Sequence, residues 1–486
     1  MNASRGLRTP HIDALASGGV RLTHYYTHPL CSPTRAALMT GRYAHRLGLQ
    51  SNVVYWDTPW GVPLNETFLP EALKRAGVAQ TAMFGKHHLG MHAPAFWPTA
   101  RGFDRFEGYL QGCGSQDTHV ASCCTAPANA SNFSAFVCDA AAGKDYRGLD
   151  WFNGSADASA AARGASSSEL IAAAAERAIA DFAAGGGRFF LYLPFQNIHA
   201  PYDARWENVA PFVAAGLALE QATMFAYIFE LDAAVGRVLA ALRAAVGDDA
   251  VVVLVSDNGA PDAPNVRDRN FPLRGFKAQT WEGGTRVPAA VFAPGRLPAG
   301  ATAHALVHAS DWLPTLVGLH GGAPRPGLDG VDQWATLAGA AAVRTEVLVN
   351  ANHLCDGGQF GPPKAALRVG DLKLLCFCFS AAGIAGANAT GCHGGPPGQW
   401  PQLYNVSADP GETRDLAAAM PAAVAALEAR LAELAGPGQA AEPMQWVPPY
   451  QGADYYCRDC PLRPATGPDA PWTDWLPDPP AEQQRA

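Results

Sequence analysis

A cysteine followed four residues later by an arginine is the pattern in this chain best suited to chemistry. Cys31 opens the run Cys31-Ser32-Pro33-Thr34-Arg35, and Gly41 follows it. We expect a short helix with Pro33 at its first position, where a missing N–H is tolerated, and Gly41 just past its end. The unpaired N–H groups and positive dipole end of that helix then face Cys31. Such a site binds anions and favours negative charge on Cys31.

Three other places in the chain offer cationic or imidazole side chains. Lys86 and His88 stand two residues apart, and His199 and Lys277 lie further along the chain. A single histidine is more often structural than catalytic, and a lone lysine is normally solvated. Two such side chains close together at the end of a strand favour a binding or acid–base role.

Asp257 and Asn258 allow two interpretations. Gly259 follows them, and Asn-Gly is a strong turn signal. The same two side chains also offer oxygen ligands for a hard cation such as Ca²⁺. Both interpretations can hold, because metal ligands often lie on turns.

Short apolar strands alternating with helices should position these residues. Strands are predicted over 20–26, 79–84, 189–193, 251–255 and 289–292. Helices are predicted from Pro10, with Thr9 as the N-cap, to the stop at Gly18-Gly19, and over 69–76, 168–184 and 225–242. This alternation indicates an α/β fold with a mostly parallel central sheet covered by helices on both faces. Ligands in such folds bind beyond the carboxyl ends of the strands. Lys86, His199 and Asp257 each follow a predicted strand, so we expect them to converge.

The pattern changes after residue 330. A hairpin is predicted over 367–379 with its turn at Gly370-Asp371, followed by a strand over 400–406 and a helix over 421–434. We therefore predict a catalytic domain at 1–335, a smaller C-terminal α+β subdomain with an antiparallel sheet at 336–440, and a Pro-rich tail at 441–486.

Composition excludes several classes of partner. The 486 residues hold 35 Lys and Arg against 43 Asp and Glu, a formal charge of −8. No basic run marks a nucleic-acid or membrane surface, and no apolar run reaches transmembrane length. We therefore expect neither a nucleic-acid partner nor a membrane span.

Cysteines and glycosylation sequons indicate the secretory pathway. Eleven cysteines leave ten, an even number, once Cys31 is set aside. Asn-x-Ser/Thr sequons are frequent and occur at Asn2, Asn65, Asn129, Asn132, Asn153, Asn388 and Asn405. Met1 to Arg5 contain no signal peptide, which conflicts with this expectation.

Longer motifs carry a family resemblance. They are Arg8-Thr9-Pro10-His11, Cys31-Ser32-Pro33-Thr34-Arg35, Gly85-Lys86-His87-His88-Leu89-Gly90, Pro272-Leu273-Arg274-Gly275, Trp281-Glu282-Gly283-Gly284 and Ser310-Asp311-Trp312-Leu313-Pro314-Thr315. Over residues 8–416 the chain resembles the type I sulfatases of the alkaline phosphatase superfamily. Within them it is most similar to the arylsulfatase B (N-acetylgalactosamine-4-sulfatase) type.

The resemblance implies a reaction and its parts. A formylglycine-generating enzyme would oxidise Cys31 to formylglycine, an aldehyde whose hydrate attacks the sulfate ester of a sugar or an aryl alcohol. One Ca²⁺ would be held by Cys31, Asp257 and Asn258. Matching family positions are Arg35, which holds the site together, Lys86 and Lys277, which bind sulfate, His88, a base, and His199, which protonates the leaving oxygen. His87 receives no role.

Disulfides follow only from the family pattern. It pairs Cys123 or Cys124 with Cys138, and Cys355 with Cys392. The resemblance also implies that the full-length protein is lysosomal or extracellular.

A paired aspartate that the family carries before its Arg-Thr-Pro-His segment is absent from this sequence. We interpret the sequence as a fragment of an active sulfatase. A truncated, non-catalytic protein that binds sulfated glycans is the alternative, and a related phosphoesterase is another. The sulfated substrate cannot be named from these motifs.

Overall fold

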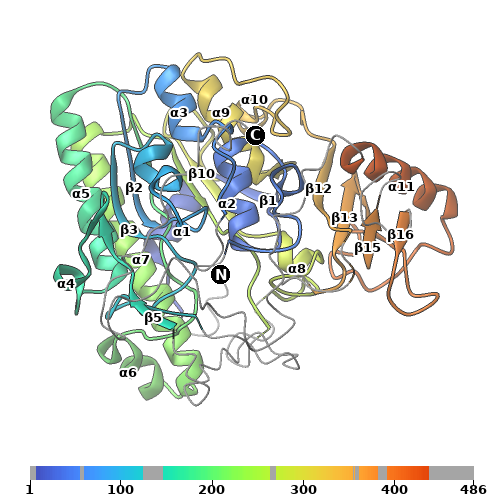
Figure 1. Cartoon of the computed structure of the whole chain (residues 1–486), viewed down its shortest axis with the longest axis horizontal. Helices are drawn as coiled ribbons and strands as arrows, with labels where there is room; N and C mark the ends of the chain where they lie inside the picture. The colour runs from blue at the N-terminus through green and yellow to red at the C-terminus, as the bar shows by residue number, and fades with distance from the viewer. Residues whose placement is uncertain are drawn as a thin grey trace.

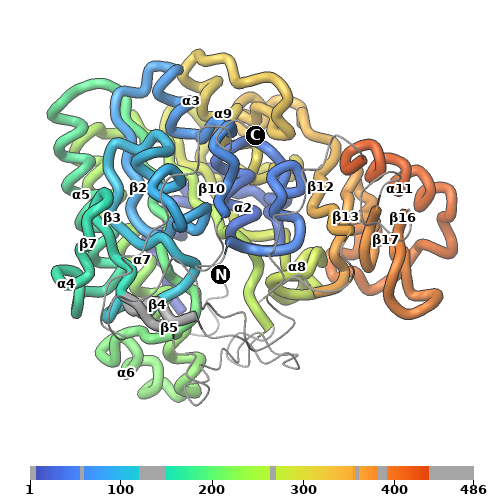
Figure 2. Tube along the Cα trace, viewed as in Figure 1, coloured from blue at the N-terminus to red at the C-terminus, as the bar shows by residue number. Residues whose placement is uncertain are grey.

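A computed structural model describes residues 7–54, 60–123, 146–262, 270–353, 355, 361–380 and 391–436. Figure 1 shows a large α/β part and, at one end of the long axis, a smaller part from β12 to α11. Figure 2 follows the same chain as a tube and shows α2 (Cys31–Thr40), the second of the described helices, in the middle of the molecule. The predicted α/β class with a smaller antiparallel C-terminal sheet is confirmed.

Two sheets form the large part. The first has the order β11-β1-β10-β9, with bounds Ala301–His308, Val20–Tyr26, Ala289–Phe292 and Val252–Val255. The second has the order β7-β6-β3-β2-β8, with bounds Ala156–Asp157, Phe152–Asn153, Arg105–Tyr109, Gln80–Lys86 and Phe189–Tyr192. A separate pair joins β4 (Val120–Cys123) to β5 (Tyr146–Leu149).

Strand directions are more mixed than predicted. β1 runs parallel to β11, and β2 runs parallel to both β3 and β8. β10 runs antiparallel to both of its neighbours, β1 and β9, and β6 runs antiparallel to β3 and β7. Periodicity identifies an apolar strand but not its direction, because direction depends on how the connections cross the sheet.

Helices cover both faces, as predicted. Along β2, Met83 packs in the cluster that contains α2 (Cys31–Thr40) and α3 (Leu69–Arg75). Its neighbours Ala82 and Phe84 pack instead with α5 (Ser167–Gly185) and α7 (Leu219–Val246). Successive side chains of a strand point to opposite faces, so two cores form. Further helices are α1 (Pro10–Gly18), α4 (Ser159–Ala162), α6 (Trp206–Ala214), α8 (Glu282–Thr285), α9 (Trp312–Leu319) and α10 (Trp334–Leu337). Among the helices described, none is both long and apolar enough to cross a membrane.

The C-terminal sheet is antiparallel throughout. It has the order β12-β13-β14-β17, with bounds Glu346–Ala351, Ala365–Val369, Leu372–Cys376 and Gln402–Asn405. The predicted hairpin turn is present, with Gly370 at a φ of 56° between β13 and β14. β15 (Cys378–Ser380) pairs with β16 (Gly391–His393), and α11 (Pro421–Ala435) packs on the sheet. The division into three domains stays a prediction, and the tail at 441–486 lies outside the described residues.

One disulfide prediction is wrong. Cys355 pairs with Cys378 rather than with Cys392, and Cys392 pairs with Cys376. The β15–β16 ladder places Phe379 opposite Cys392, which brings Cys392 beside the chain that leaves β14. Cα separations of 5.4 and 5.1 Å suit both bridges. The other predicted pair, Cys123 or Cys124 with Cys138, falls on residues whose side chains lie outside the described part.

A buried charge cluster joins the two parts of the molecule. Lys373 of β14 donates to Glu282 of α8 (Nζ to Oε1, 2.9 Å) and lies 3.1 Å from Glu412 Oε1. Tyr26 donates to the other Glu282 oxygen at 2.7 Å, and the Glu282 N–H donates to Glu412 Oε2 at 2.7 Å. Lys373, Glu282 and Glu412 are each 0% exposed. Burial raises the pKa of Glu412 to about 7, while the neighbouring Lys373 charge lowers it. We name Lys373, Glu282 and Glu412 together the charge clamp.

Three buried histidines also lie at this junction. His28 has its Nδ1 2.7 Å from the Val349 carbonyl oxygen, and its Nε2 accepts the Ala44 N–H at 3.1 Å. Its ring is therefore neutral, with the proton on Nδ1. His308 lies edge-to-face with His28 at a centroid distance of 5.1 Å, and His45 contacts the Leu434 carbonyl from Nε2 at 3.1 Å. Burial lowers the pKa of His28 to about 4, that of His45 to about 3, and that of His308 well below its usual value.

These histidines predict loss of stability in acid. Their pKa values are lower in the folded chain than the ordinary 6.5, so the unfolded chain binds more protons below pH 6.5. Stability is fully present above pH 6.5 and should fall as the pH drops towards 4, by on the order of 3 kcal/mol for His28 alone. Urea unfolding at pH 7, 6, 5 and 4 measures this slope. His28→Gln should flatten it, and replacement of the exposed His304 by Gln should not. An equal slope in wild type and His28→Gln would contradict the explanation.

Candidate active site

Helix α2 brings Cys31 to the centre of the site. The helix begins at Cys31 itself, so the prediction that Pro33 is the first residue is wrong. Pro33 is tolerated at the third position because the N–H groups of the first turn have no partner within the helix. Gly41 closes the helix as predicted, with a φ of 71° and its N–H bonded to the Ala37 carbonyl at 2.9 Å. Cys31 is 2% exposed, and its thiol donates to Asn258 Oδ1 at 3.4 Å.

Arg35 links helix α2 to three other parts of the chain around Cys31. Its Nε and Nη2 both donate to Asp257 Oδ2, at 3.0 and 2.8 Å. Its Nη1 donates to the Lys86 carbonyl at 3.0 Å and to the Tyr192 hydroxyl at 3.4 Å. Arg35 thus holds α2, the end of β2, the end of β8 and the turn after β9 together. The alternative role considered for it, a surface ion pair, does not apply, because its side chain is 8% exposed.

Lys277 and His199 form a pair. Lys277 Nζ lies 3.0 Å from His199 Nε2, and His199 Nδ1 lies 2.7 Å from the Ala200 carbonyl oxygen. The carbonyl needs a donor, so Nδ1 carries the proton and Nε2 accepts from the lysine. Burial, followed by the positive charges of Lys277 and Lys86, lowers the pKa of His199. The ring is neutral and lies next to a proton donor.

Lys86 and His88 lie at and after the end of β2. Lys86 is 2% exposed, and burial lowers its pKa. Burial and the Lys86 charge lower the pKa of His88 to about 4. Gly112 lies against the His88 ring, where a Cβ would come within 2.5 Å of Cε1, so no larger residue fits there. His87 is buried beside them, burial lowers its pKa to about 3, and it stays without an assigned role.

The charges around Cys31 favour an anion. Burial alone raises the pKa of its thiol. The positive charges of Lys277 and Lys86, together with the His199 and His88 side chains, outweigh burial and bring the pKa of Cys31 well below its usual range. The predicted site residues are therefore brought together, and their arrangement stabilises negative charge at the Cys31 side chain.

Asp257 and Asn258 offer only part of a metal site. They follow β9, as predicted, and Asn258 Oδ1 faces Cys31. Asp257 Oδ2 already accepts two hydrogen bonds from Arg35. Within the described residues, no group of three or more His, Cys, Asp or Glu side chains could hold a metal ion. Ca²⁺ takes six to eight oxygens, so the described residues alone do not fit a calcium site.

Sequence reasoning missed two residues of this region. Tyr192 ends an apolar strand, and its hydroxyl at the carboxyl end was a usable signal. Asn270 gave none. Its Oδ1 accepts the Ala260 N–H at 2.9 Å, and its Nδ2 donates to the Ala260 and Gly275 carbonyls, both at 3.0 Å. The Lys277 N–H bonds to the same Ala260 carbonyl at 2.9 Å, so Asn270 ties the Asp257 turn to the Lys277 loop.

Comparison with known proteins now adds to this geometry. The Sulfatase family model matches residues 1–322. The chain belongs to the sulfatase family. This sulfatase is 30% identical to mouse arylsulfatase J over 469 residues, which cover 91% of this chain and 74% of that protein. It is 33% identical to human arylsulfatase A over 432 residues, covering 84% of this chain and 78% of the relative. The chain is accordingly a sulfuric ester hydrolase.

Solved structures agree on the fold. The crystal structure of Ps i-CgsB in complex with k-i-k-neocarrahexaose matches with a TM-score of 0.70 and 25% identity, covering 90% of this chain and 88% of that one. A phosphonate monoester hydrolase from Silicibacter pomeroyi matches with a TM-score of 0.53 and 18% identity over 88% of this chain and 90% of that one, which shows a shared fold alone. Arylsulfatase B is not one of the relatives named here, and specificity of that type stays a prediction.

Loss of Asn270 should slow this sulfatase. Asn270→Ala removes three hydrogen bonds of about 1 kcal/mol each, so kcat/KM for an aryl sulfate should fall by roughly 10- to 100-fold. Asn270→Asp keeps the acceptor for Ala260 N–H but loses both donors, so its kcat/KM should lie between those of wild type and alanine variant. Asn208→Ala is a matched control, since its Nδ2 donates to Glu230 at 2.8 Å outside the site. Wild-type kcat/KM in both Asn270 variants would contradict a positioning role.

Proposed function

We propose that this sulfatase hydrolyses the sulfate ester of a sugar or an aryl alcohol through a formylglycine made from Cys31. The observation that carries the proposal is the buried Cys31 side chain at the start of α2 with Lys86, Lys277 and His199 around it. Formylglycine supplies a hydrated aldehyde, one hydroxyl of which is the nucleophile and the other the route by which sulfate leaves. A formylglycine-generating enzyme is then a required partner.

Each nearby side chain has a proposed task. Lys86 and Lys277 bind the sulfuryl oxygens and offset the negative charge that grows in the transition state. Lys277 donates to His199 Nε2 across their 3.0 Å contact, and a proton passed from Lys277 to Nε2 would let His199 protonate the leaving oxygen. His88 serves as a base. Arg35 acts as a positioning residue, because it contacts Asp257 and the Lys86 backbone.

Calcium remains a prediction based on the family. Cys31, Asp257 and Asn258 are its expected ligands, and the described residues leave its shell incomplete. We derive no catalytic step through a metal. The incomplete set of calcium ligands is the observation that favours a second candidate function: a sulfatase-fold protein that binds sulfated glycans without hydrolysing them.

The test combines mass spectrometry with turnover. The Cys31 peptide of protein from a eukaryotic host should contain the aldehyde, and an aryl sulfate should be hydrolysed faster than the matching aryl phosphate. An unmodified thiol in every copy would overturn the formylglycine proposal. Binding of a sulfated oligosaccharide without sulfate release would favour the non-catalytic candidate, and faster phosphate turnover would favour a phosphoesterase. Comparing N-acetylgalactosamine 4-sulfate with the 6-sulfate tests arylsulfatase B-type specificity.

Secretory localisation and glycosylation form part of the proposal and predict where sugars attach. Asn65 is exposed in a turn closed by a 3.1 Å bond from Glu66 N–H to the Pro63 carbonyl, and Asn153 is exposed at the β6–β7 hairpin. Asn405 is half-buried in β17, with its Oδ1 bonded to the Ala408 N–H at 3.0 Å. Glycopeptide mapping should find sugars on Asn65 and Asn153 and none on Asn405. Occupied Asn405 with bare Asn65 would contradict this. The other sequons lie outside the described residues.

A further inference from the structure

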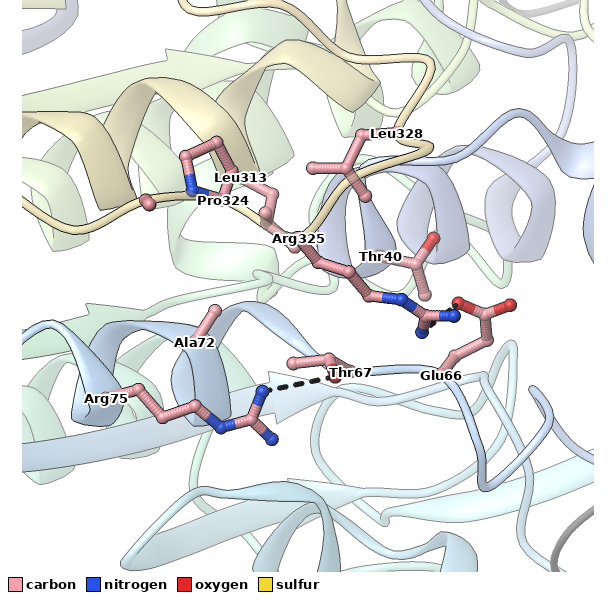
Figure 3. A pocket seen from close by; sticks show the side chains of 10 residues that line it. Thr40, Glu66, Thr67, Ala72, Arg75, Leu313, Pro324, Arg325 and Leu328 are labelled. Atoms are coloured by element: carbon pink, nitrogen blue, oxygen red, sulfur yellow. Dashed lines mark hydrogen bonds and ion pairs between the residues drawn. The ribbon is translucent and has the colours of Figure 1, made fainter.

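A small pocket lies at the opposite end of α2 from Cys31. It has a volume of about 60 Å³ and is bordered by Thr40, the last residue of α2, by α3 and by the loop that carries Arg325 (Figure 3). Cys31 is the first residue of the same helix. At 1.5 Å per residue, the two ends of α2 are about 14 Å apart along its axis. The pocket is therefore separate from the site around Cys31.

Positive charge is in excess at this pocket. Glu66 is 8% exposed and forms an ion pair with Arg42, while Arg325 lies 3.8 Å from its other oxygen. Arg75 donates to the Thr67 hydroxyl at 3.4 Å. Figure 3 shows the Arg75 guanidinium beside Thr67 and the Arg325 guanidinium beside Glu66, with Thr67 between the two guanidinium groups. One buried carboxylate thus faces three guanidinium groups among the described residues.

An unsatisfied donor strengthens the same conclusion. Arg42 pairs with Glu66 from outside the pocket lining, and its buried Nε has no hydrogen-bond partner within the described part of the chain. A cation in the last turn of a helix interacts favourably with the helix dipole, which accounts for Arg75 at the end of α3. That effect does not account for Arg325, which lies on a loop, or for the missing acceptor at Arg42. The cluster lacks negative charge and acceptor atoms.

We propose that this pocket binds a small oxyanion between Arg75 and Arg325, as a second binding site separate from the catalytic one. A tetrahedral sulfate or a sulfate ester group suits it, because a guanidinium presents paired donors to such oxygens. Thr67 adds a hydroxyl beside the Arg75 guanidinium, and Leu313, Leu328 and Ala72 are apolar lining residues. Arg75 and Arg325 are both exposed, so an anion can reach them from solvent. The anion is either free sulfate or a sulfate group on a sugar.

The binding test uses the full chain and inorganic sulfate as the probe. Isothermal titration should show sulfate sites of two classes in the wild type. Arg75→Gln with Arg325→Gln should weaken one class at least tenfold and leave the other. Arg21→Gln is a matched control, since that exposed arginine also donates to a threonine hydroxyl, Thr302, at 3.3 Å. The protein is measured with and without its N-glycans, because Asn65 adjoins the pocket through a 3.4 Å contact from Arg325 to its carbonyl.

Three further results decide the proposal. Crystals soaked in selenate should give an anomalous peak between Arg75 and Arg325. Replacing both arginines with lysine should restore sulfate binding at least in part, which separates lost charge from lost folding. Turnover of a small aryl sulfate should not change in the glutamine variant, so failure of this proposal differs from failure of the proposed function. Titrations that superimpose for wild type and the glutamine variant would overturn the second site.

The source of the oxyanion is decided by competition. A monosulfated sugar that displaces selenate from the pocket at a lower concentration than inorganic sulfate would indicate a sugar-borne sulfate. Displacement by inorganic sulfate alone would indicate the free ion. Both results support an oxyanion site. A selenate peak only at the Cys31 site would contradict it.

Discussion

Cys31→Ala should abolish turnover of an aryl sulfate, with kcat/KM falling on the order of 10⁴-fold or more. Loss of a covalent nucleophile has an effect of that size or larger in enzymes that act through one. Alanine keeps Cβ, the carbon that becomes the aldehyde, but lacks the Sγ at which the oxidation begins, so no aldehyde forms while Lys86, Lys277 and His199 stay in place. Alanine is smaller than cysteine, so the buried position can accept it. Steady-state kinetics with an aryl sulfate measures the loss.

Two comparisons separate lost chemistry from lost binding. Cys31→Ser keeps the size of the side chain and supplies a hydroxyl. Serine has an oxygen in place of the sulfur at which conversion to formylglycine begins, so we expect little turnover. Both variants should still bind the substrate, because the two lysines that hold the sulfuryl oxygens are unchanged. Turnover in Cys31→Ala within tenfold of the wild type would show that the nucleophile lies elsewhere.

Lys373→Met should destabilise the folded chain by about 3–5 kcal/mol, because buried Glu412 loses its cation and buried Glu282 keeps Arg286, at 3.5 Å, in place of two partners. Lys373, Glu282 and Glu412 are each 0% exposed, so water cannot replace the lost charge. Methionine has a similar length, which keeps packing losses small. Urea unfolding followed by circular dichroism and tryptophan fluorescence measures the change. Lys277 lies on the loop just before α8, so activity should fall as well.

Removing the charge of Glu282, the ion-pair partner of Lys373, is the decisive control. Adding Glu282→Gln to Lys373→Met should recover part of the lost stability, because one unpaired carboxylate disappears. Lys74→Met should change stability by less than about 1 kcal/mol, since its ion pair with Asp104 is partly exposed. If Lys373→Met and Lys74→Met unfold at the same urea concentration, the charge clamp does not stabilise the fold.

Much of the candidate site could be predicted because its residues follow apolar strands. Lys86 ends β2, His199 and Asp257 come after β8 and β9, and the structure gathers the three around Cys31 and Arg35. Strands could be found because a short apolar run between turn residues is a local signal. Helix α5 was predictable from its alanine-rich sequence and the glycines at its end, and the β13–β14 hairpin from its Gly370-Asp371 turn.

Other features depend on contacts between distant parts of the chain. The direction of β10, the pairing of Cys355 with Cys378 and the bonds of Asn270 each depend on which segments fold together. No local pattern records such choices. The excess of arginine around Glu66 also escaped prediction, because Arg42, Arg75 and Arg325 come from three separate stretches of sequence.

The charge clamp has a consequence for any attempt to produce a shorter protein. A chain that stopped at residue 335 would keep every candidate catalytic residue, from Cys31 to Lys277, but it would lose Lys373 and Glu412. Glu282 would then lose Lys373 and keep Arg286, 3.5 Å away, as an ion-pair partner, just after the loop that carries Lys277. The minimal unit for expression is therefore set by the C-terminal sheet, and a truncation series should lose soluble protein once its end point passes Glu412.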